Sequence, residues 1–124
     1  MARSSYEAVQ SWSDQVTKLG ELAMQSVRDV DTHAISLNGE MDLANYDEVE
    51  DEFLRVEDGD ARFIVIDLSG LTFVDCSAIR MFCAASERAR AHGDPDRLWW
   101  LRPPEHVHRV LQLAGIDERL QFAD

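Results

Sequence analysis

The chain has 124 residues, 45% of them hydrophobic, which is enough for one compact domain with its own core. With 24 acidic residues against 12 basic ones, its formal net charge is -12, and a field of this sign disfavours nucleic acids and anionic membranes as partners. Two cysteines, no apolar signal-peptide core at the N-terminus and no run approaching the ~20 apolar residues of a membrane span together predict a protein of the reducing cytoplasm.

Residues 1–20 are expected to form an amphipathic helix that precedes a second unit, residues 21–124. Between residues 5 and 19 apolar side chains recur at helical spacing, and Gly20 is typical of the end of a helix. The apolar positions are Tyr6, Val9, Trp12, Val16 and Leu19. This stripe would pack on the rest of the chain or on a second copy, so a homodimer is one arrangement that it allows.

Two strands are predicted next, over residues 21–30 and 32–39, joined by a short polar turn and able to pair as a hairpin. A helix follows within residues 40–56. Asn45 is its candidate N-cap, and Glu48, three residues later, completes the pattern of a capping box. The buried stripe of this helix is expected to consist of Val49, Phe53 and Val56.

The second half begins with RFIVIDL, residues 62–68, a continuous apolar run typical of a strand buried on both faces of a parallel sheet. Residues 69–74 link this strand to Asp75, and a helix is predicted from Cys76 to Gly93. A strand at residues 98–101 and a helix that starts after Pro103-Pro104 follow. The side chains expected to face inward from these two helices are Ile79, Phe82, Cys83 and Ser86, and then Val107, Val110, Leu111 and Ala114.

Strands and helices therefore alternate, which predicts an α/β fold with a mixed sheet of four to five strands covered by helices. In such sheets, functional side chains gather where a strand ends and a helix begins. Asp75 stands at such a point and would cap the helix, so that Cys76 and Ser77 fall in its first turn. The free N–H groups and the positive dipole end at that place favour an anion such as phosphate.

Three segments carry a resemblance to a known family. They are ISLNGEMD at residues 35–42, IVIDLSGLTFVDCSAI at 64–79 and LQLAGIDERLQF at 111–122. In this order they resemble the STAS domains, and the anti-sigma factor antagonists (anti-anti-sigma factors) in particular. Those proteins have a Gly-Glu-Leu-Asp turn, then a buried strand with Asp-Ser-Ser/Thr-Gly-Leu, and later a Leu-x-Gly-Leu segment. The resemblance covers about residues 21–124.

The resemblance implies a regulatory switch, with no enzymatic activity and no cofactor. In the family, the unphosphorylated antagonist binds an anti-sigma factor, which is also a serine kinase of the histidine-kinase-like ATPase type, and so releases a sigma factor. The kinase inactivates the antagonist by phosphorylating a serine, and a metal-dependent phosphatase restores it. Roughly two negative charges added at a contact surface suit such a switch, because they add repulsion and a desolvation cost.

The chain departs from the family at the acceptor position, the first residue after the aspartate, which here is Cys76. Ser77 matches the second Ser/Thr, and Ala78 replaces the glycine. Three interpretations stay open: the protein binds its partner without a phosphate switch, Ser77 has become the phospho-acceptor, or Cys76 senses the redox state. A STAS scaffold subunit of a larger signalling assembly is the alternative to an antagonist.

The partner-binding surface is predicted around Asp42, Asp75, Cys76, Ser77 and Ala78, with Asp42 matching the aspartate of the family's turn. Residues 40–60 hold ten acids and one base, a run that is either a solvated helix face or an attraction for a basic partner.

Other chemistry is not predicted. His106 and His108 are two positions apart on a helix and do not share a face, so they do not begin a metal site. No histidine is placed near Ser77 by the pattern, which argues against a hydrolase triad.

Overall fold

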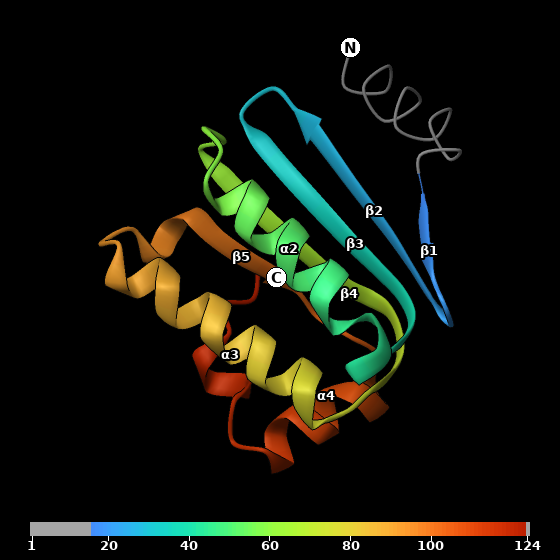
Figure 1. Ribbon diagram of the computed structural model, residues 1–124. Coiled ribbons are helices and arrows are strands. Elements are labelled where there is room, and N and C mark those ends of the chain that lie inside the picture. Colours follow the sequence, from blue (N-terminus) through green and yellow to red (C-terminus); the bar gives the residue numbers. More distant parts are fainter. Residues whose placement is uncertain (1–15, 124) are drawn as a thin grey trace.

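A hairpin followed by two strand–helix units builds the sheet of this protein (Figure 1). The structure, a computed structural model, describes residues 16–123. The strands lie in the order β1-β2-β3-β4-β5; β1, β2 and β3 are antiparallel, and β3, β4 and β5 are parallel. This arrangement confirms the predicted mixed sheet of an α/β fold.

The strands are β1 (Thr17–Leu19), β2 (Leu22–Asp29), β3 (Thr32–Met41), β4 (Phe63–Val74) and β5 (Leu98–Leu101). The α-helices are α2 (Tyr46–Glu57), α3 (Cys76–Ala91) and α4 (Glu105–Leu113). Short 3-10 helices lie between them: η2 (Leu43–Asn45), η3 (Pro95–Arg97) and η4 (Asp117–Arg119).

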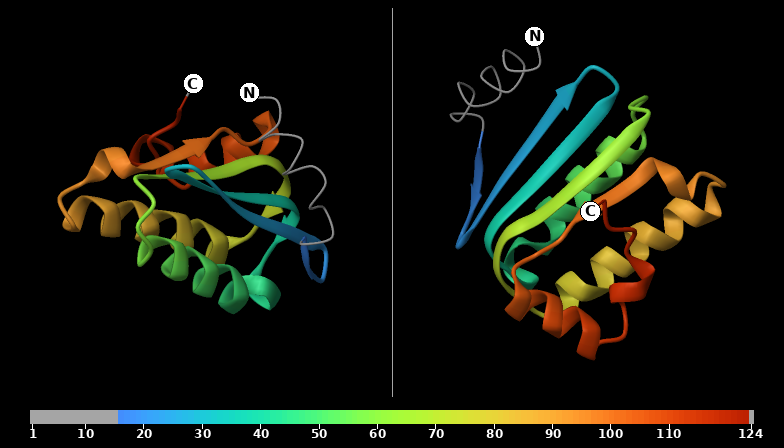
Figure 2. Two further views of the ribbon diagram at one scale, coloured as in Figure 1. Left: turned by 90° about the horizontal axis from the view of Figure 1, so that it is seen from above. Right: turned by 180° about the vertical axis from the view of Figure 1, so that it is seen from behind.

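The two crossover helices, α2 and α3, lie side by side on one face of the sheet (Figure 2). Crossovers between parallel strands are right-handed, so strands added in chain order place their helices on the same face. Trp100 of β5 is fully buried there, with its ring edge-on to Phe53 of α2 and Phe82 of α3 at centroid distances of 6.4 and 5.2 Å. Arg88 of α3 also donates two hydrogen bonds, of 2.7 and 2.8 Å, to the Glu57 carboxylate of α2.

Strand β1 occupies the end of the helix predicted over residues 5–19. Residues 5–15 lie outside the described part of the chain, but Thr17–Leu19 pairs with β2, so the helix prediction is wrong for these residues. Gly20, with a φ of 67°, turns the chain from β1 into β2 instead of ending a helix. The sheet therefore begins before the predicted boundary at residue 21.

Strand β4 is longer than predicted and less buried. It runs through Val74, because it stays paired with β3 across two register shifts, so residues 69–74 are strand and not a linker. Its burial alternates: Ile64, Ile66 and Leu68 are buried, while the residues between them are partly exposed. The prediction that both faces of this strand are buried is wrong, since both crossover helices lie on one face of the sheet.

The helices bury most, but not all, of the predicted residues. Val49, Phe53 and Val56 of α2 are buried as predicted. On α3, Phe82 and Ser86 are buried, whereas Ile79 and Cys83 are partly exposed and Met81 and Ala85 are buried in addition. On α4, Val107 and Leu111 are buried, whereas Val110 and Ala114 are exposed. Helical spacing thus identified each helix but not the angle at which it rests on the sheet.

The two edges of the sheet are built differently. At one edge, β1 is only 3 residues long. At the other, the C-terminal segment runs beside β5: Trp100 N–H donates to the Gln121 carbonyl, and Ala123 N–H donates to the Trp100 carbonyl, both at 2.9 Å. Phe122 forms a parallel bridge to Trp100. The segment predicted as a final extended piece therefore covers the edge of β5.

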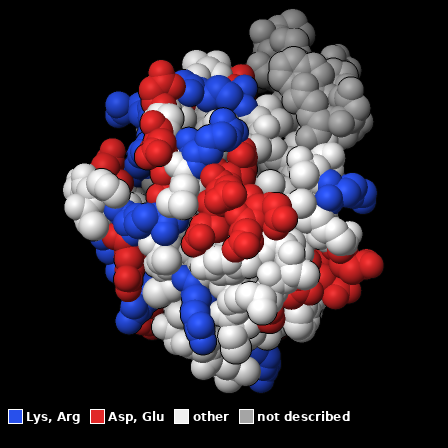
Figure 3. All heavy atoms as spheres, in the orientation of Figure 1, with Lys and Arg blue, Asp and Glu red and all other residues white. Residues whose placement is uncertain are grey.

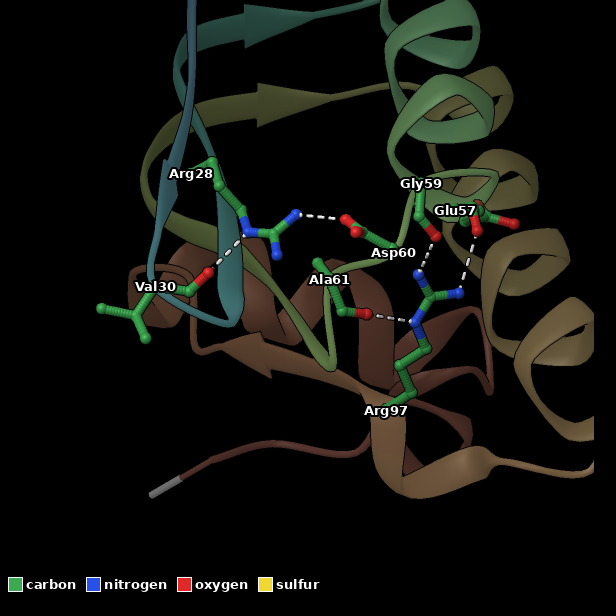
Figure 4. Close-up of polar contacts among 7 residues, drawn as sticks. All are labelled: Arg28, Val30, Glu57, Gly59, Asp60, Ala61 and Arg97. Atoms are coloured by element: carbon green, nitrogen blue, oxygen red, sulfur yellow. Dashed lines mark hydrogen bonds and ion pairs between the residues drawn. The ribbon is translucent and has the colours of Figure 1, made fainter.

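Two arginines hold the segment between α2 and β4 from opposite sides (Figure 4). Arg97 of η3 donates to three carbonyls, those of Glu57, Gly59 and Ala61, each at 2.9 Å. These carbonyls lie at and beyond the C-terminal end of α2, where helix carbonyls lack intrahelical partners.

Arg28, near the tip of the β2–β3 hairpin, donates to the Asp60 carboxylate and to the Val30 carbonyl, both at 2.8 Å. The two arginines together tie the hairpin, the end of α2 and the start of β5 into one unit at this end of the sheet.

Replacing Arg97 by lysine is expected to lower the free energy of unfolding by about 2 kcal/mol, because an ammonium group cannot reproduce a guanidinium fork that reaches three carbonyls. Urea unfolding measures the effect. Arg109→Lys, an exposed change on α4, is the matched control and should leave stability unchanged. Equal stability of the two variants would contradict the role assigned to Arg97.

Val30→Gly is expected to raise the free energy of unfolding by about 1 kcal/mol. Val30 has a φ of 55°, a conformation that is unfavourable for a β-branched residue, and it is 85% exposed, so little packing is lost. Val27→Gly, the same change within β2, should instead lower stability. Thermal unfolding of both variants tests the pair, and a loss of stability in Val30→Gly would show that the valine side chain is favourable there.

Candidate functional site

The carboxyl ends of β3 and β4 lie side by side at the same end of the strands, and the chain passes from each of them into a helix (Figure 1). After β3 comes the loop of Asp42 and η2, and after β4 comes Asp75 at the start of α3. The two segments are joined directly, because Asp75 N–H donates to the Met41 carbonyl at 3.2 Å and Leu43 N–H donates to the Asp75 carboxylate at 3.0 Å. We call residues 42–45, which include η2, and residues 75–78, which include the first turn of α3, the switch-edge loops.

Gly39 allows β3 to reach this edge. Its φ is 111°, and a Cβ at this position would lie 2.1 Å from the Glu21 carbonyl oxygen, which is backbone and cannot move aside. The next residue, Glu40, donates its N–H to that same carbonyl at 3.0 Å. Only glycine fits this close approach, which gives a physical reason for the Gly-Glu pair before the first switch-edge loop.

The first loop is closed by Asp42 and Asn45. The Asp42 carboxylate accepts the Ala44 N–H at 3.0 Å, and the Asn45 side-chain oxygen accepts the Asp42 N–H at 3.1 Å, which together make a capping box for η2. The capping box predicted for Asn45 and Glu48 is therefore wrong: Asn45 precedes α2 but makes no side-chain cap to it. The pattern occurs three residues earlier.

Asn45 has a further role that sequence reasoning missed. Its side chain is buried, and its amide NH₂ donates to the Glu40 carbonyl at 3.1 Å and to the Leu19 carbonyl at 3.4 Å. One side chain thus links the loop to the ends of β1 and β3. A short polar residue at a helix start suggested a cap, and nothing in the local pattern indicated these longer contacts.

Asp75 is the residue on which the second loop depends. One carboxylate oxygen accepts the Ala78 N–H at 3.1 Å and the Ser77 hydroxyl at 2.6 Å, and the other accepts the Leu43 N–H at 3.0 Å. The predicted N-cap is confirmed. Partial burial raises the pKa of Asp75, but hydrogen bonds from the Ser77 hydroxyl and the Ala78 and Leu43 N–H groups outweigh it and hold this pKa below its usual value.

The three residues after Asp75 face different surroundings. The Cys76 side chain is exposed, whereas Ser77 is half-buried with its hydroxyl donated to Asp75. Ala78 is completely buried against the core, so the prediction that it contacts a partner is wrong for its side chain. The position that reaches solvent at the helix start is therefore a thiol, and the neighbouring hydroxyl is already engaged.

Leu43 adds an apolar element that sequence reasoning missed. Its side chain is 73% exposed, in the same loop as Asp42 and in direct backbone contact with Asp75. Single exposed apolar side chains are common on protein surfaces, so Leu43 is of interest here only because of its place beside Asp42 and Asp75. An exposed leucine has no sequence signature, because its neighbours along the chain do not reveal which way it points.

Acidic side chains gather over α2, beside the first switch-edge loop (Figure 3). Asp47, Glu48 and Asp51 are exposed on this helix. Figure 3 also shows basic side chains on the same face, so the charge of this surface is divided and not uniformly negative.

The described residues also bear on metals, histidines and membrane spans. Within residues 16–123, no group of three or more His, Cys, Asp or Glu side chains is placed to hold a metal ion. His106 bonds to the Thr72 carbonyl at 2.9 Å, and His108 lies against the Phe122 ring, so the two histidines serve different contacts. None of the helices in this part of the chain combines the length and the apolar composition of a membrane span.

Comparison with known protein families shows to which family the chain belongs. The family model described as "Mlab, STAS domain" matches residues 24–122, which include both switch-edge loops. The chain belongs to the STAS domain family. The predicted resemblance is thereby confirmed at the level of the family. No curated protein matched the chain in a direct comparison.

Several solved structures share the fold of this chain. An anti-sigma factor antagonist from Mycobacterium paratuberculosis is 18% identical, with a TM-score of 0.71 over 90% of this chain and 89% of that one. A putative anti-sigma factor antagonist from Thermotoga maritima is 21% identical, with a TM-score of 0.67 over 82% and 86%. The Bacillus cell fate determinant SpoIIAA, in its phosphorylated form, is 21% identical, with a TM-score of 0.62 over 82% and 92%.

Replacing Asp75 by asparagine is expected to lower the free energy of unfolding at pH 7 by about 1–2 kcal/mol, because an amide NH₂ would face the Leu43 N–H. The folded-state pKa of Asp75 is lowered, so its stabilisation is complete above the unfolded-state value of about 3.9 and is lost as the pH falls through the lower folded-state value.

The difference in the free energy of unfolding between the wild type and Asp75→Asn should therefore become smaller in acid. Urea unfolding at pH 7 and at about pH 3 measures it. Asp51→Asn, at an exposed position on α2, is the control and should show little difference at pH 7. A gap that stays constant between the two pH values would contradict the stabilising role of the carboxylate charge.

Proposed function

We propose that this STAS domain is an anti-sigma factor antagonist that binds a kinase-type anti-sigma factor and thereby releases a sigma factor. The observation that carries the proposal is the exposed Cys76 side chain at the first turn of α3, held beside the first switch-edge loop by Asp75. Membership of the family and the shared fold of solved antagonists support it. This is a regulatory function that needs no catalysis by the chain.

The proposed contact surface consists of Asp42, Leu43, Asp75, Cys76 and Ser77. Leu43 offers an apolar anchor, while Asp42 and Asp75 supply the fixed polar rim around it. Their carboxylates are held by backbone N–H groups, so the surface is largely preorganised and a partner would not have to order it. Ala78 supports this surface from below.

The proposed partner is a serine kinase of the histidine-kinase-like ATPase type with a basic contact surface. The net charge of -12 and the exposed acids of α2 would attract it from a distance. Such attraction is screened by salt, so association should slow as the ionic strength rises.

The usual phosphate switch is altered in this chain. The exposed position at the helix start is Cys76, which lacks the hydroxyl that a serine kinase modifies. Ser77 remains the candidate acceptor, but its hydroxyl lies 2.6 Å from the Asp75 carboxylate. A phosphoryl group there would remove this hydrogen bond and set roughly two negative charges against Asp75, which would disturb the start of α3. We therefore propose that the chain binds its partner and that phosphorylation at position 76 does not regulate this binding.

Recovery of the partner tests the function directly. Tagged protein is purified from its own lysate with ATP and Mg²⁺, its intact mass is measured and the bound protein is identified. A kinase-type partner with unchanged bait mass supports an antagonist without the phosphate switch. One added phosphoryl group mapped to Ser77 would identify the acceptor and, if a metal-dependent phosphatase removes it, a complete cycle. A stable oligomer without such a partner would favour the scaffold alternative.

Changes at Cys76 test the surface. Cys76→Asp is expected to weaken binding of the purified partner at least tenfold, about 1.4 kcal/mol, because it buries a charge in the contact. Cys76→Ser should keep the affinity and restore a hydroxyl at the family's acceptor position.

Gln112→Asp, an exposed change near the end of α4, adds the same charge at a residue outside the switch-edge loops and serves as the matched control. Isothermal titration measures all three variants. Equal affinities for Cys76→Asp and Gln112→Asp would place the partner elsewhere on the molecule.

A further inference from the structure

The sheet carries a row of apolar side chains on the face that α2 and α3 leave uncovered. Val27 of β2 pairs with Ala34 of β3, Ala34 pairs with Val65 of β4, and Val65 pairs with Trp99 of β5. Side chains alternate between the two faces along a strand, and Trp100, the neighbour of Trp99, is buried against α2 and α3. The four paired residues therefore face away from these helices, and we call them the open-face row.

The open-face row lies outside the hydrophobic core. Each of its side chains is partly exposed, and none of them is among the described residues that form the core or pack against it. Figure 2 shows this face from behind, where β2, β3 and β4 lie in front of α2 and α3. Helix α4 meets β4 at the Thr72 carbonyl, which accepts from His106 seven residues beyond Val65. In this view no described helix lies over the row.

An uncovered apolar row is unusual for strands of this kind. Strands β3, β4 and β5 are parallel, and parallel sheets occur almost only with both faces covered. The row also has no free polar side-chain atom, because its single such group, the Trp99 indole N–H, donates to the Asp96 carbonyl at 2.7 Å. The row therefore suits an apolar surface and not a charged ligand.

The N-terminal segment joins the sheet close to this row. Residues 1–15 lie outside the described part of the chain, which begins at Val16. Strand β1 pairs with β2 so that Thr17 lies opposite Met24. Because the two strands are antiparallel, the chain before Thr17 approaches the sheet beside the part of β2 that leads from Met24 to Val27.

The sequence of this segment matches the open-face row in chemistry and in length. Within residues 5–15, Tyr6, Val9 and Trp12 recur at helical spacing. A helix this short is marginal in water unless its apolar side packs on something. Eleven helical residues span about 16 Å at 1.5 Å each, and four strands set roughly 4.8 Å apart span about 14 Å. A second copy is disfavoured as the cover, because two chains of net charge -12 repel each other.

We propose that residues 5–15 pack across the open-face row of the same chain. Tyr6, Val9 and Trp12 contact the row, so that the sheet has a covering layer on each face. This contact lies on the opposite face of the sheet from α3, whose start carries Cys76. The proposal does not depend on the function proposed for the switch-edge loops.

Nuclear Overhauser effects in the isotope-labelled full chain test the contact directly. They are expected between the ring protons of Trp12 and the methyl groups of Val27 and Val65. A sample that mixes labelled and unlabelled chains separates contacts within one chain from contacts between two. Absence of these effects would overturn the proposal, and effects that arise only between chains would overturn it by assigning the row to a second copy.

A double-mutant cycle measures the coupling between the segment and the row. Trp12→Ala and Val65→Thr should each raise the equilibrium constant of unfolding in urea. Together they should raise it about fivefold less than the product of their separate effects, because both remove the same contact. Threonine keeps the β-branched shape of valine, so Val65→Thr is expected to fold, and circular dichroism verifies this.

Val110→Thr, the same change at a residue of α4 that is 38% exposed, is the matched control. Its effect should combine with that of Trp12→Ala as a simple product. Independent effects of Trp12→Ala and Val65→Thr would overturn the proposal.

Discussion

The parallel pairing of β3 with β4 is the constraint on which the rest of this molecule depends. It runs from Thr32 and Phe63 at one end to Met41 and Val74 at the other, through two register shifts. Because both strands end at the same edge, the loops that follow them must meet there. The contacts of Asp75 with Leu43 and Met41 follow from this pairing, and so does the position of Cys76 at the solvent-facing end of α3.

The Asp75 carboxylate then gives the three residues that follow it different surroundings. By accepting the Ser77 hydroxyl and the Ala78 N–H, Asp75 turns the first helical turn so that Ala78 packs inward and Cys76 points outward. The chemistry that the helix start exposes to solvent is set by which residue occupies the outward position. In this chain that residue carries sulfur, while the hydroxyl next to it is consumed by the cap. The fold of the family is therefore retained, and the residue that this fold exposes at the helix start is Cys76.

Local patterns predicted the elements well, because they depend on residues close in sequence. The hairpin, the α2 stripe of Val49, Phe53 and Val56, and the cap at Asp75 all follow from spacing and short-range chemistry. The remaining features depend on partners far along the chain. Asn45 resembles a helix cap until β1 and β3 come near it, and Ala78 resembles a surface residue until the core is assembled.

The same limit applied to β4 and to the N-terminal segment. A run of apolar residues predicts burial but not on how many faces, and only the one-sided arrangement of α2 and α3 decides that for β4. Val16 and Leu19 fit a helical stripe as well as they fit an edge strand. Pairing with β2, which is not local information, selects the strand at residues 17–19.

The C-terminal segment beside β5 has a consequence for the protein's behaviour in concentrated solution. An open sheet edge offers unpaired N–H and carbonyl groups to the edge of another molecule, which is a common start of aggregation. Here residues 121–123 bond to Trp100 and occupy part of that edge, while the opposite edge ends in a strand of only 3 residues. Residues 121–123 thus leave less of this edge open to pairing with another molecule, and Phe122 among them also packs against the core.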